Sequence, residues 1–242
     1  MKMYIKIIQT IAKRYPQVIP YLKGKARFVA CADSLPEWAD YFTKTVEFFQ
    51  KTLERLIISV YNNQVGGEFI DILANLISGQ LKQAVDKAWQ DEGGEGATPS
   101  YLQELAMEAT VKQFVHVDKL YRDIVDARVD ETPIDPLLSR VALWANRWTE
   151  TYNAAVALIV AQRGGNLVWK LGHTEEHCAT CNALNGIVAG AVEWQALDIH
   201  PQNAPNNKLE CGGWRCGCTL TPTKAKRTPR AYELISAAIE RI

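Results

Sequence analysis

The chain has 242 residues, which is enough to bury a full hydrophobic core in one large domain or two smaller ones. Its 27 basic and 27 acidic residues balance, so the protein as a whole carries no net charge that would attract nucleic acid. Charged residues interrupt the apolar positions near the amino end, which disfavours a membrane span of ~20 residues and a secretory signal, and therefore favours reduced cysteines.

The charge is unevenly distributed along the chain. Residues 1–32 contain seven basic side chains and no carboxylate. A second basic segment, Lys224–Arg230, lies near the carboxyl end and also contains Lys226 and Arg227. Basic arms of this kind contact phosphates or an acidic protein neighbour, although most charge runs are simply solvated. Direct DNA contact through the two basic termini is therefore left open.

The first predicted helix covers residues 37–61. Ser34 and Glu37, with Pro36 between them, have the spacing of a capping box at a helix start. Apolar residues then recur in steps of four and three, which places them on one stripe of a helix. The stripe consists of Phe42, Val46, Phe49, Leu53, Leu56 and Val60.

Two more helices follow the same periodicity. The second begins near Gly67 and ends at the Gly93–Gly96 linker, and its predicted core positions are Phe69, Leu73, Leu76, Leu81, Val85 and Trp89. The third begins after Thr98-Pro99-Ser100, where Ser100 and Gln103 again have capping spacing, and it should end before Pro133. Its predicted core positions are Leu102, Leu105, Ala109, Val117, Leu120, Tyr121 and Ile124.

A fourth helix is expected from Asp135 to Gly164. Asp135 can cap the start of this helix with a side-chain oxygen, and Pro136 occupies the first helical position, where a proline is favourable. Trp144 and Trp148 lie on the apolar stripe of this helix, and we interpret them as packing residues rather than as part of a cofactor site.

The character of the sequence changes after Gly165. Residues 166–171 predict a short strand, and residues 200–208 form a Pro/Asn-rich loop. A final amphipathic helix is expected, with Tyr232, Leu234, Ile235, Ala238 and Ile239 on its apolar face. A domain boundary is therefore expected near Gly164.

Five of the six cysteines form a cluster in the sequence after this boundary. They are arranged as Cys178-x-x-Cys181, then Cys211, then Cys216-x-Cys218. A Cys-x-x-Cys pair followed by further cysteines beyond a long loop is typical of a tetrahedral Zn²⁺ site, and the long loop itself costs only ~0.6 kcal/mol per doubling of its length. A disulfide framework or reactive thiols are the alternatives.

The cluster offers more ligands than one zinc ion needs. Our predicted set is Cys178, Cys181, Cys211 and Cys216, with Cys218 as the main rival for the fourth place. His173, His177 and His200 are further candidates, of which His177 is expected to lie beside the site rather than to bind. Gly212, Gly213 and Gly217 suit tight turns around the ion, because only glycine adopts positive φ freely. The sixth cysteine, Cys31, has no assigned role.

One enzymatic motif shares parts of this segment. His173-x-Glu175 followed by Cys178-x-x-Cys181 contains the pieces of a zinc deaminase signature. The two halves stand too close together to open separate helices, which argues against that activity. We find no glycine-rich phosphate loop, no nucleophile elbow and no paired acidic metal motif, and so we predict a protein that is not an enzyme.

Four features in this order resemble a known family. They are Arg140–Ala155, Val168–Lys170, Cys178–Gly186 and Cys211–Leu220. Together they are similar to the minor head proteins of tailed bacteriophages, the phage Mu F-like or head morphogenesis family, in which a helix leads to a strand, a Cys-x-x-Cys and a closing Cys-x-Cys. The similarity covers roughly residues 137–221.

The closing motif departs from the family pattern in two places. Gly213 stands where the family has a histidine, and Cys211, two residues earlier, is the candidate for the missing ligand. Arg215 precedes Cys216 instead of standing between the two cysteines. The resemblance implies a low-copy virion component, made in the host cytoplasm, that associates with portal or capsid proteins and assists head assembly and DNA packaging or exit.

These observations predict a mainly α protein, with a helical bundle-like body followed by a small zinc-stapled α+β module. The expected segments are a basic arm (1–33), the body (34–163), the cysteine-rich module (165–222) and a basic segment with a helix (223–242). In the module the metal is expected to replace a hydrophobic core. Neither a membrane nor a small-molecule substrate is expected as a partner. The alternative function is a zinc-dependent nucleic-acid-binding protein that uses the basic termini together with Trp194 and Trp214 as exposed aromatic residues.

Overall fold

The computed structural model describes residues 46–172, 176–201, 206–213 and 216–240. The predicted amino-terminal arm, the start of the first predicted helix, Cys31, His173 and Trp214 lie outside these residues. The described part is mainly α-helical with a small α+β region, as predicted, and the strands of that region form one antiparallel sheet. It divides into two compact units. The helical unit comprises the described chain up to Asp86 together with Thr98–Trp148, and the cysteine unit comprises Lys87–Ala97 together with the described chain from Thr149 onward.

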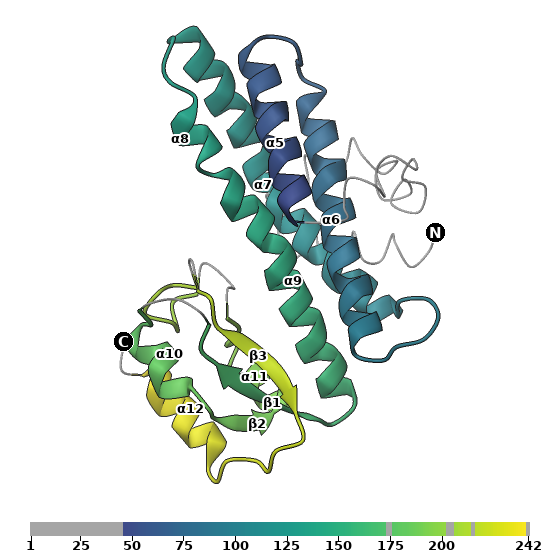
Figure 1. Ribbon diagram of the computed structural model, residues 1–242, viewed down its shortest axis with the longest axis vertical. Helices are drawn as coiled ribbons and strands as arrows, with labels where there is room; N and C mark the ends of the chain where they lie inside the picture. The colour runs from purple at the N-terminus through teal and green to yellow at the C-terminus, as the bar shows by residue number, and fades with distance from the viewer. Residues whose placement is uncertain (1–45, 173–175, 202–205, 214–215, 241–242) are drawn as a thin grey trace. The chain divides into compact units, whose positions relative to one another are not determined.

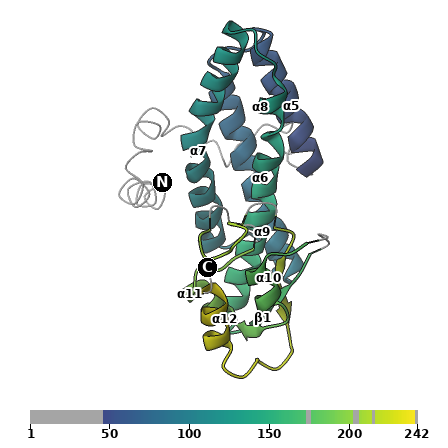
Figure 2. The same cartoon turned by 90° about the vertical axis from the view of Figure 1, so that its left-hand side faces the viewer.

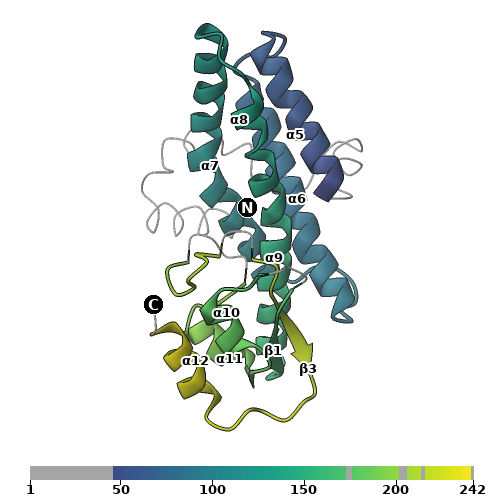
Figure 3. The same ribbon diagram turned by 60° about the vertical axis from the view of Figure 1, so that its left-hand side comes forward.

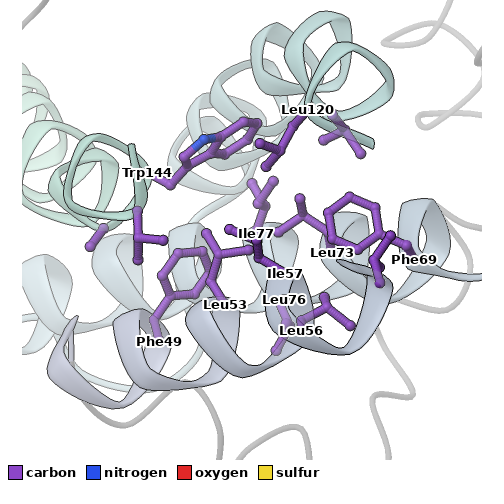
Figure 4. Packing of buried hydrophobic residues seen from close by; sticks show 14 of the residues in the cluster. Phe49, Leu53, Leu56, Ile57, Phe69, Leu73, Leu76, Ile77, Leu120 and Trp144 are labelled. Atoms are coloured by element: carbon purple, nitrogen blue, oxygen red, sulfur yellow. The ribbon is translucent and has the colours of Figure 1, made fainter. Parts of the chain in front are cut away.

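The helical unit is built on the apolar stripes that the sequence predicts. Helix α5 (Val46–Tyr61) buries Phe49, Leu53 and Val60 on one side, and the first two of these lie about one helical turn apart. Their side chains meet those of α6 (Phe69–Asp91), α7 (Ser100–Val129) and α9 (Val141–Gln162) in one core, which Figure 4 shows from close by. Trp144 belongs to this core, so the interpretation of Trp144 as a packing residue is confirmed.

The start of α7 differs from the predicted capping box. Pro99 is the N-cap residue and Ser100 is already helical, so the Ser100 side chain is not in the position to cap. Gln103 instead donates from Nε2 to the carbonyl of Thr98 at 2.7 Å. The spacing correctly indicated a helix start, but it placed the cap one residue too late.

The predicted fourth helix is divided into two. Helix α8 covers only Asp135–Leu138, and α9 starts again at Val141. The hydroxyl of Ser139 donates to the carbonyl of Pro136 at 2.7 Å, a local hydrogen bond that competes with continued helix. Arg140 reaches Asp123 of α7, with 2.5 Å between Nη1 and Oδ2. Pattern analysis had no signal for these contacts.

The cysteine unit contains a three-stranded antiparallel sheet in the order β2-β1-β3. The central strand β1 (Asn166–Lys170) confirms the predicted strand to within one residue and pairs with β2 (Val188–Gly190) and β3 (Thr219–Thr223). Three short helices accompany the sheet: α10 (Ala179–Leu184), α11 (Ala191–Ala196) and α12 (Ala231–Ile239). Figures 1 and 2 show α10 beside α12, and the two helices are in contact.

The cysteine unit has a hydrophobic core of its own. Trp169 of β1 and Trp194 of α11 are both 0% exposed, with 5.9 Å between their ring centroids. The indole Nε1 of Trp194 donates to the carbonyl of Leu167, and Leu184 and Ile235 are also fully buried. Two expectations were therefore wrong: a metal does not replace a core here, and Trp194 is not an exposed aromatic residue. The error arose because the buried residues lie on elements too short to show periodicity.

The last helix uses a narrower apolar stripe than predicted. Ala231, Ile235 and Ala238 are buried at steps of four and three, whereas Tyr232 and Leu234 are exposed. Tyr232 and Leu234 had both been assigned to the predicted apolar face. The five residues predicted for that face cover too wide an arc of the helix to be buried together. Among the described residues, none of the helices is long and apolar enough to cross a membrane.

Candidate metal centre

Three segments of the chain bring the five clustered cysteines together. Cys178 is the N-cap residue of α10, and Cys181 lies in the first turn of that helix. Cys211 lies in the turn-rich loop 206–213, and Cys216 and Cys218 precede β3. Segments far apart in sequence thus converge on one end of α10, as the cysteine spacing predicted.

The sulfur atoms form two overlapping groups of three. Cys178, Cys181 and Cys211 form one group, and Cys181, Cys216 and Cys218 form the other, with all ligand atoms in a group within 4.8 Å of one another. The Sγ atoms of Cys181 and Cys216 are 3.9 Å apart. A tetrahedral Zn²⁺ with bonds of ~2.3 Å to sulfur separates its thiolates by about 3.8 Å, so this spacing fits a metal centre.

None of the five clustered cysteines forms a disulfide in the structure. The 3.9 Å between Cys181 and Cys216 is almost twice the ~2.05 Å of a disulfide bond. The arrangement can hold a metal ion, and the disulfide framework that we considered is not formed. The choice of four ligands among the five cysteines remains a prediction.

The environment does not favour ionised thiols without a cation. The hydrogen bond to Cys216, together with burial, raises the pKa of Cys181, and burial raises the pKa of Cys211 to about 11. Burial also raises the pKa of Cys218. For Cys178, hydrogen bonds from the backbones of Cys181 and Cys211 outweigh burial and lower the pKa. Most of the cluster would therefore need a bound cation to become thiolate at neutral pH.

Polar side chains that sequence analysis missed hold the loop against α10. Glu210 accepts a hydrogen bond at Oε2 from the backbone amide of Ala179 at 2.6 Å. In return, the backbone amide of Glu210 donates to Oγ1 of Thr180 at 3.3 Å. These two bonds fix Cys211, the next residue, beside the first turn of the helix. Its position next to Cys211 was the only sequence signal for Glu210.

Glycines allow the backbone to turn closely around the sulfur atoms. Gly212 and Gly213 have φ of 61° and 77°, as predicted. Gly172 and Gly217 lie against each other, because a Cβ placed on Gly172 would stand 2.0 Å from the carbonyl oxygen of Gly217. Gly217 thus lies at a close approach of two backbone segments.

Neither His177 nor His200 belongs to either sulfur group. Nδ1 of His177 lies 3.9 Å from Sγ of Cys218, but neither group includes His177. Nδ1 of His200 is buried without a hydrogen-bond partner, and burial lowers the pKa of this imidazole. Among the described residues, the groups able to hold a metal therefore consist of cysteines alone.

Comparison of the chain with protein-family models, with curated proteins and with solved structures finds no match.

Proposed function

We propose that this chain is a non-enzymatic structural protein of a bacteriophage or prophage head, with a structural Zn²⁺ in its cysteine unit. The observation that carries the proposal is the convergence of Cys178, Cys181, Cys211, Cys216 and Cys218, because these residues lie in the motifs that resemble the minor head protein family. In this role the protein associates with portal or capsid proteins and assists head assembly and DNA packaging or exit.

The metal centre would act by joining segments that the chain itself connects only loosely. Thiolates from α10, from the loop 206–213 and from the segment before β3 would bind one ion, which supplies charge neutralisation and fixed tetrahedral geometry. The unit's hydrophobic core lies on the neighbouring strands and helices. Core and metal together would make this unit a rigid surface for contact with a neighbouring protein.

Metal analysis of the purified protein tests the zinc site. We expect about one zinc per chain, bound more weakly in Cys178→Ser and in Cys216→Ser. Cys31→Ser is the matched control, because Cys31 is remote from the cluster in sequence and should keep full metal content. Absence of zinc in the wild type, together with normal folding of both cluster variants, would refute the metal centre.

Analysis of phage particles tests the viral role. The chain should be present at low copy in purified virions or in assembly intermediates from a host that encodes it. Cross-linking in those particles should connect it to portal or capsid protein. If the chain is absent from virions and from all assembly intermediates, the viral assignment is wrong even if zinc is bound.

The alternative is a zinc-dependent nucleic-acid-binding protein. The exposed cations Lys224, Lys226 and Arg230 favour it, whereas the burial of Trp194 removes one of the two aromatic residues that it needed. Its test is the salt dependence of DNA binding, because phosphate contacts weaken steeply as salt rises. Negligible binding at low salt would end this alternative.

A further inference from the structure

A pocket of about 280 Å³ opens at one end of the sheet in the cysteine unit. It lies where α9 ends, β1 begins and β3 ends, and Figure 3 shows β1 and β3 side by side in this unit. The pocket is lined by Val160, Arg163, Gly165, Asn166, Pro222, Thr223 and Lys224. It is separate from the cysteine cluster, since none of the five cysteines lines it.

The walls of the pocket are fixed by backbone structure. Asn166 and Thr223 are partners in the β1–β3 ladder, and the amide of Gly165 donates to the carbonyl of Val160 at 2.9 Å. Val160 and Pro222 give the pocket apolar walls. The pocket is therefore preformed, and an apolar side chain entering it would not have to order a loop.

Two cations stand at the pocket. Arg163 is exposed, and it is held by a hydrogen bond of 2.6 Å from Nη1 to the carbonyl of Glu92 and by the ring of Trp89, 5.7 Å from Cζ to the centroid. A guanidinium has five N–H donors, so this bond leaves others for a ligand. Lys224 is exposed and lines the pocket as well. A carboxylate bound at the pocket would meet both of these cations.

The two chain segments that line the pocket are rich in basic residues, although the carboxylate of Glu92 interacts electrostatically with Arg163. Residues 161–172 and 219–232 contain no aspartate or glutamate. Their cations are Arg163, Lys170, Lys224, Lys226, Arg227 and Arg230, of which Arg227 pairs with Glu193. The basic segment is not a free arm, because Thr228 forms two hydrogen bonds of 2.9 Å with the backbone of Val188. The carboxyl-terminal basic segment is thus anchored to β2, and of these cations Arg163 and Lys224 line the pocket itself.

We propose that this pocket is a docking site for an acidic peptide segment of a partner protein that inserts one apolar side chain. The apolar walls match that side chain, and the cations at the pocket match carboxylates on either side of it. A nucleic acid fits less well, because no aromatic ring lines the pocket and its walls offer nothing to a stacked base. This inference goes beyond the proposed function, since it concerns a surface that can be tested on the isolated protein.

The experiment measures binding of a fluorescently labelled peptide by anisotropy. The probe is a dodecapeptide of Asp and Glu with one central Leu. Its comparison peptides replace that Leu by Gly, or all of the carboxylates by their amides, and an oligothymidylate of equal length tests nucleic acid. The protein variant is Lys224→Glu, and Lys170→Glu is its matched control. Lys170 is also exposed, but it pairs with Thr219 at the opposite end of β1.

We expect the wild type to bind the Leu-containing acidic peptide and Lys224→Glu to bind it about fivefold to tenfold more weakly. Lys170→Glu should change the affinity less than twofold, a factor typical of a distant exposed charge. The Gly and amide peptides should bind about tenfold more weakly than the probe. Thermal unfolding of both variants checks that the fold is intact.

Three results would overturn the inference. They are no binding of the probe at low salt, equal losses in Lys224→Glu and Lys170→Glu, or tighter binding of the oligothymidylate that Lys224→Glu abolishes. The last result would show that this surface binds nucleic acid and not an acidic peptide. Absence of the chain from virions, by contrast, would refute the proposed viral role and leave the peptide-binding result unaffected.

Discussion

The two units reach a buried core by different means. The helical unit uses helices of 16, 23 and 30 residues, whose apolar stripes pack along most of their lengths. Apart from the end of α9, the cysteine unit uses helices of six to nine residues and strands of three to five. Isolated helices of that length are not stable in water, so each depends on tertiary contacts. A cross-link between short elements therefore matters far more in the cysteine unit.

This difference predicts how each unit responds to damage. A cavity in the helical unit should lower its stability and leave metal binding unchanged. Loss of the metal should loosen the cysteine unit, while its buried tryptophans keep part of the core together. The following variants test this contrast.

The largest effect is expected from Cys181→Ala. Cys181 belongs to both sulfur groups, so its removal leaves neither group with three ligands. We expect complete loss of bound zinc and a partial decrease of the near-ultraviolet circular dichroism, with most of the far-ultraviolet helical signal retained. Metal analysis and circular dichroism measure these changes.

Cysteines that belong to only one sulfur group provide the control variants for Cys181→Ala. Cys211→Ala and Cys218→Ala each leave one group of three intact, so each should weaken zinc binding without abolishing it. Equal behaviour of all three variants would show that Cys181 has no special place in the site.

The second effect is expected from Gly172→Ala. The added Cβ would stand 2.0 Å from the carbonyl oxygen of Gly217, and a backbone atom cannot rotate away as a side chain can. We expect a loss of about 4 kcal/mol in the free energy of unfolding of the cysteine unit and weaker zinc binding. Gly67→Ala is the control, because a Cβ there meets nothing within 4 Å. Chemical denaturation measures the free energy of unfolding of both variants. A Gly172→Ala protein as stable as the wild type would contradict the close approach of Gly172 and Gly217.

The third effect concerns the helical unit. Leu53 is 0% exposed, and Leu53→Ala should destabilise this unit by about 3 kcal/mol through lost burial and the cavity that remains. Ile58→Ala on the same helix is the control, because Ile58 is 40% exposed and should cost less than about 1 kcal/mol. Zinc content should stay at the wild-type level in both variants, and a loss of zinc in Leu53→Ala would break the separation between the units.

The contrast between the units also decides what the sequence could predict. Long stripes such as Phe49, Leu53 and Val60 were predictable, because a helix repeats its buried positions over many residues. The break between α8 and α9 was not, because it depends on Ser139 and on an ion pair with Asp123 of another helix. Periodicity reports the average course of a helix and is insensitive to a two-residue interruption.

In the cysteine unit the chemistry was predictable and the architecture was not. The convergence of the cysteines followed from their spacing and from the ligand preferences of zinc. The strands β2 and β3, the burial of Trp194 and the role of Glu210 did not follow. These features depend on pairing with β1 and on contacts across about thirty residues of sequence, such as that between Ala179 and Glu210.

The smallest effect concerns the hydrogen bond within the cysteine unit between Tyr152 and Asp91. The Tyr152 hydroxyl donates to Oδ2 of Asp91 at 2.8 Å, and burial together with this carboxylate raises the pKa of Tyr152 to about 12. A folded-state pKa above the unfolded value of ~10 means that the bond stabilises fully below pH ~10 and loses its effect as the pH rises through ~12. Tyr152→Phe should therefore cost about 1 kcal/mol at pH 8, a value reduced by solvent screening.

The wild type and Tyr152→Phe should become closer in stability between pH 10 and pH 12, within the ~2-unit interval set by the two pKa values. Thermal unfolding of both proteins across this range measures the difference between them, and effects of alkali on the thiols and lysines are common to both and cancel. A difference that stays constant up to pH 12 would mean that the hydroxyl contributes nothing through its bond to Asp91.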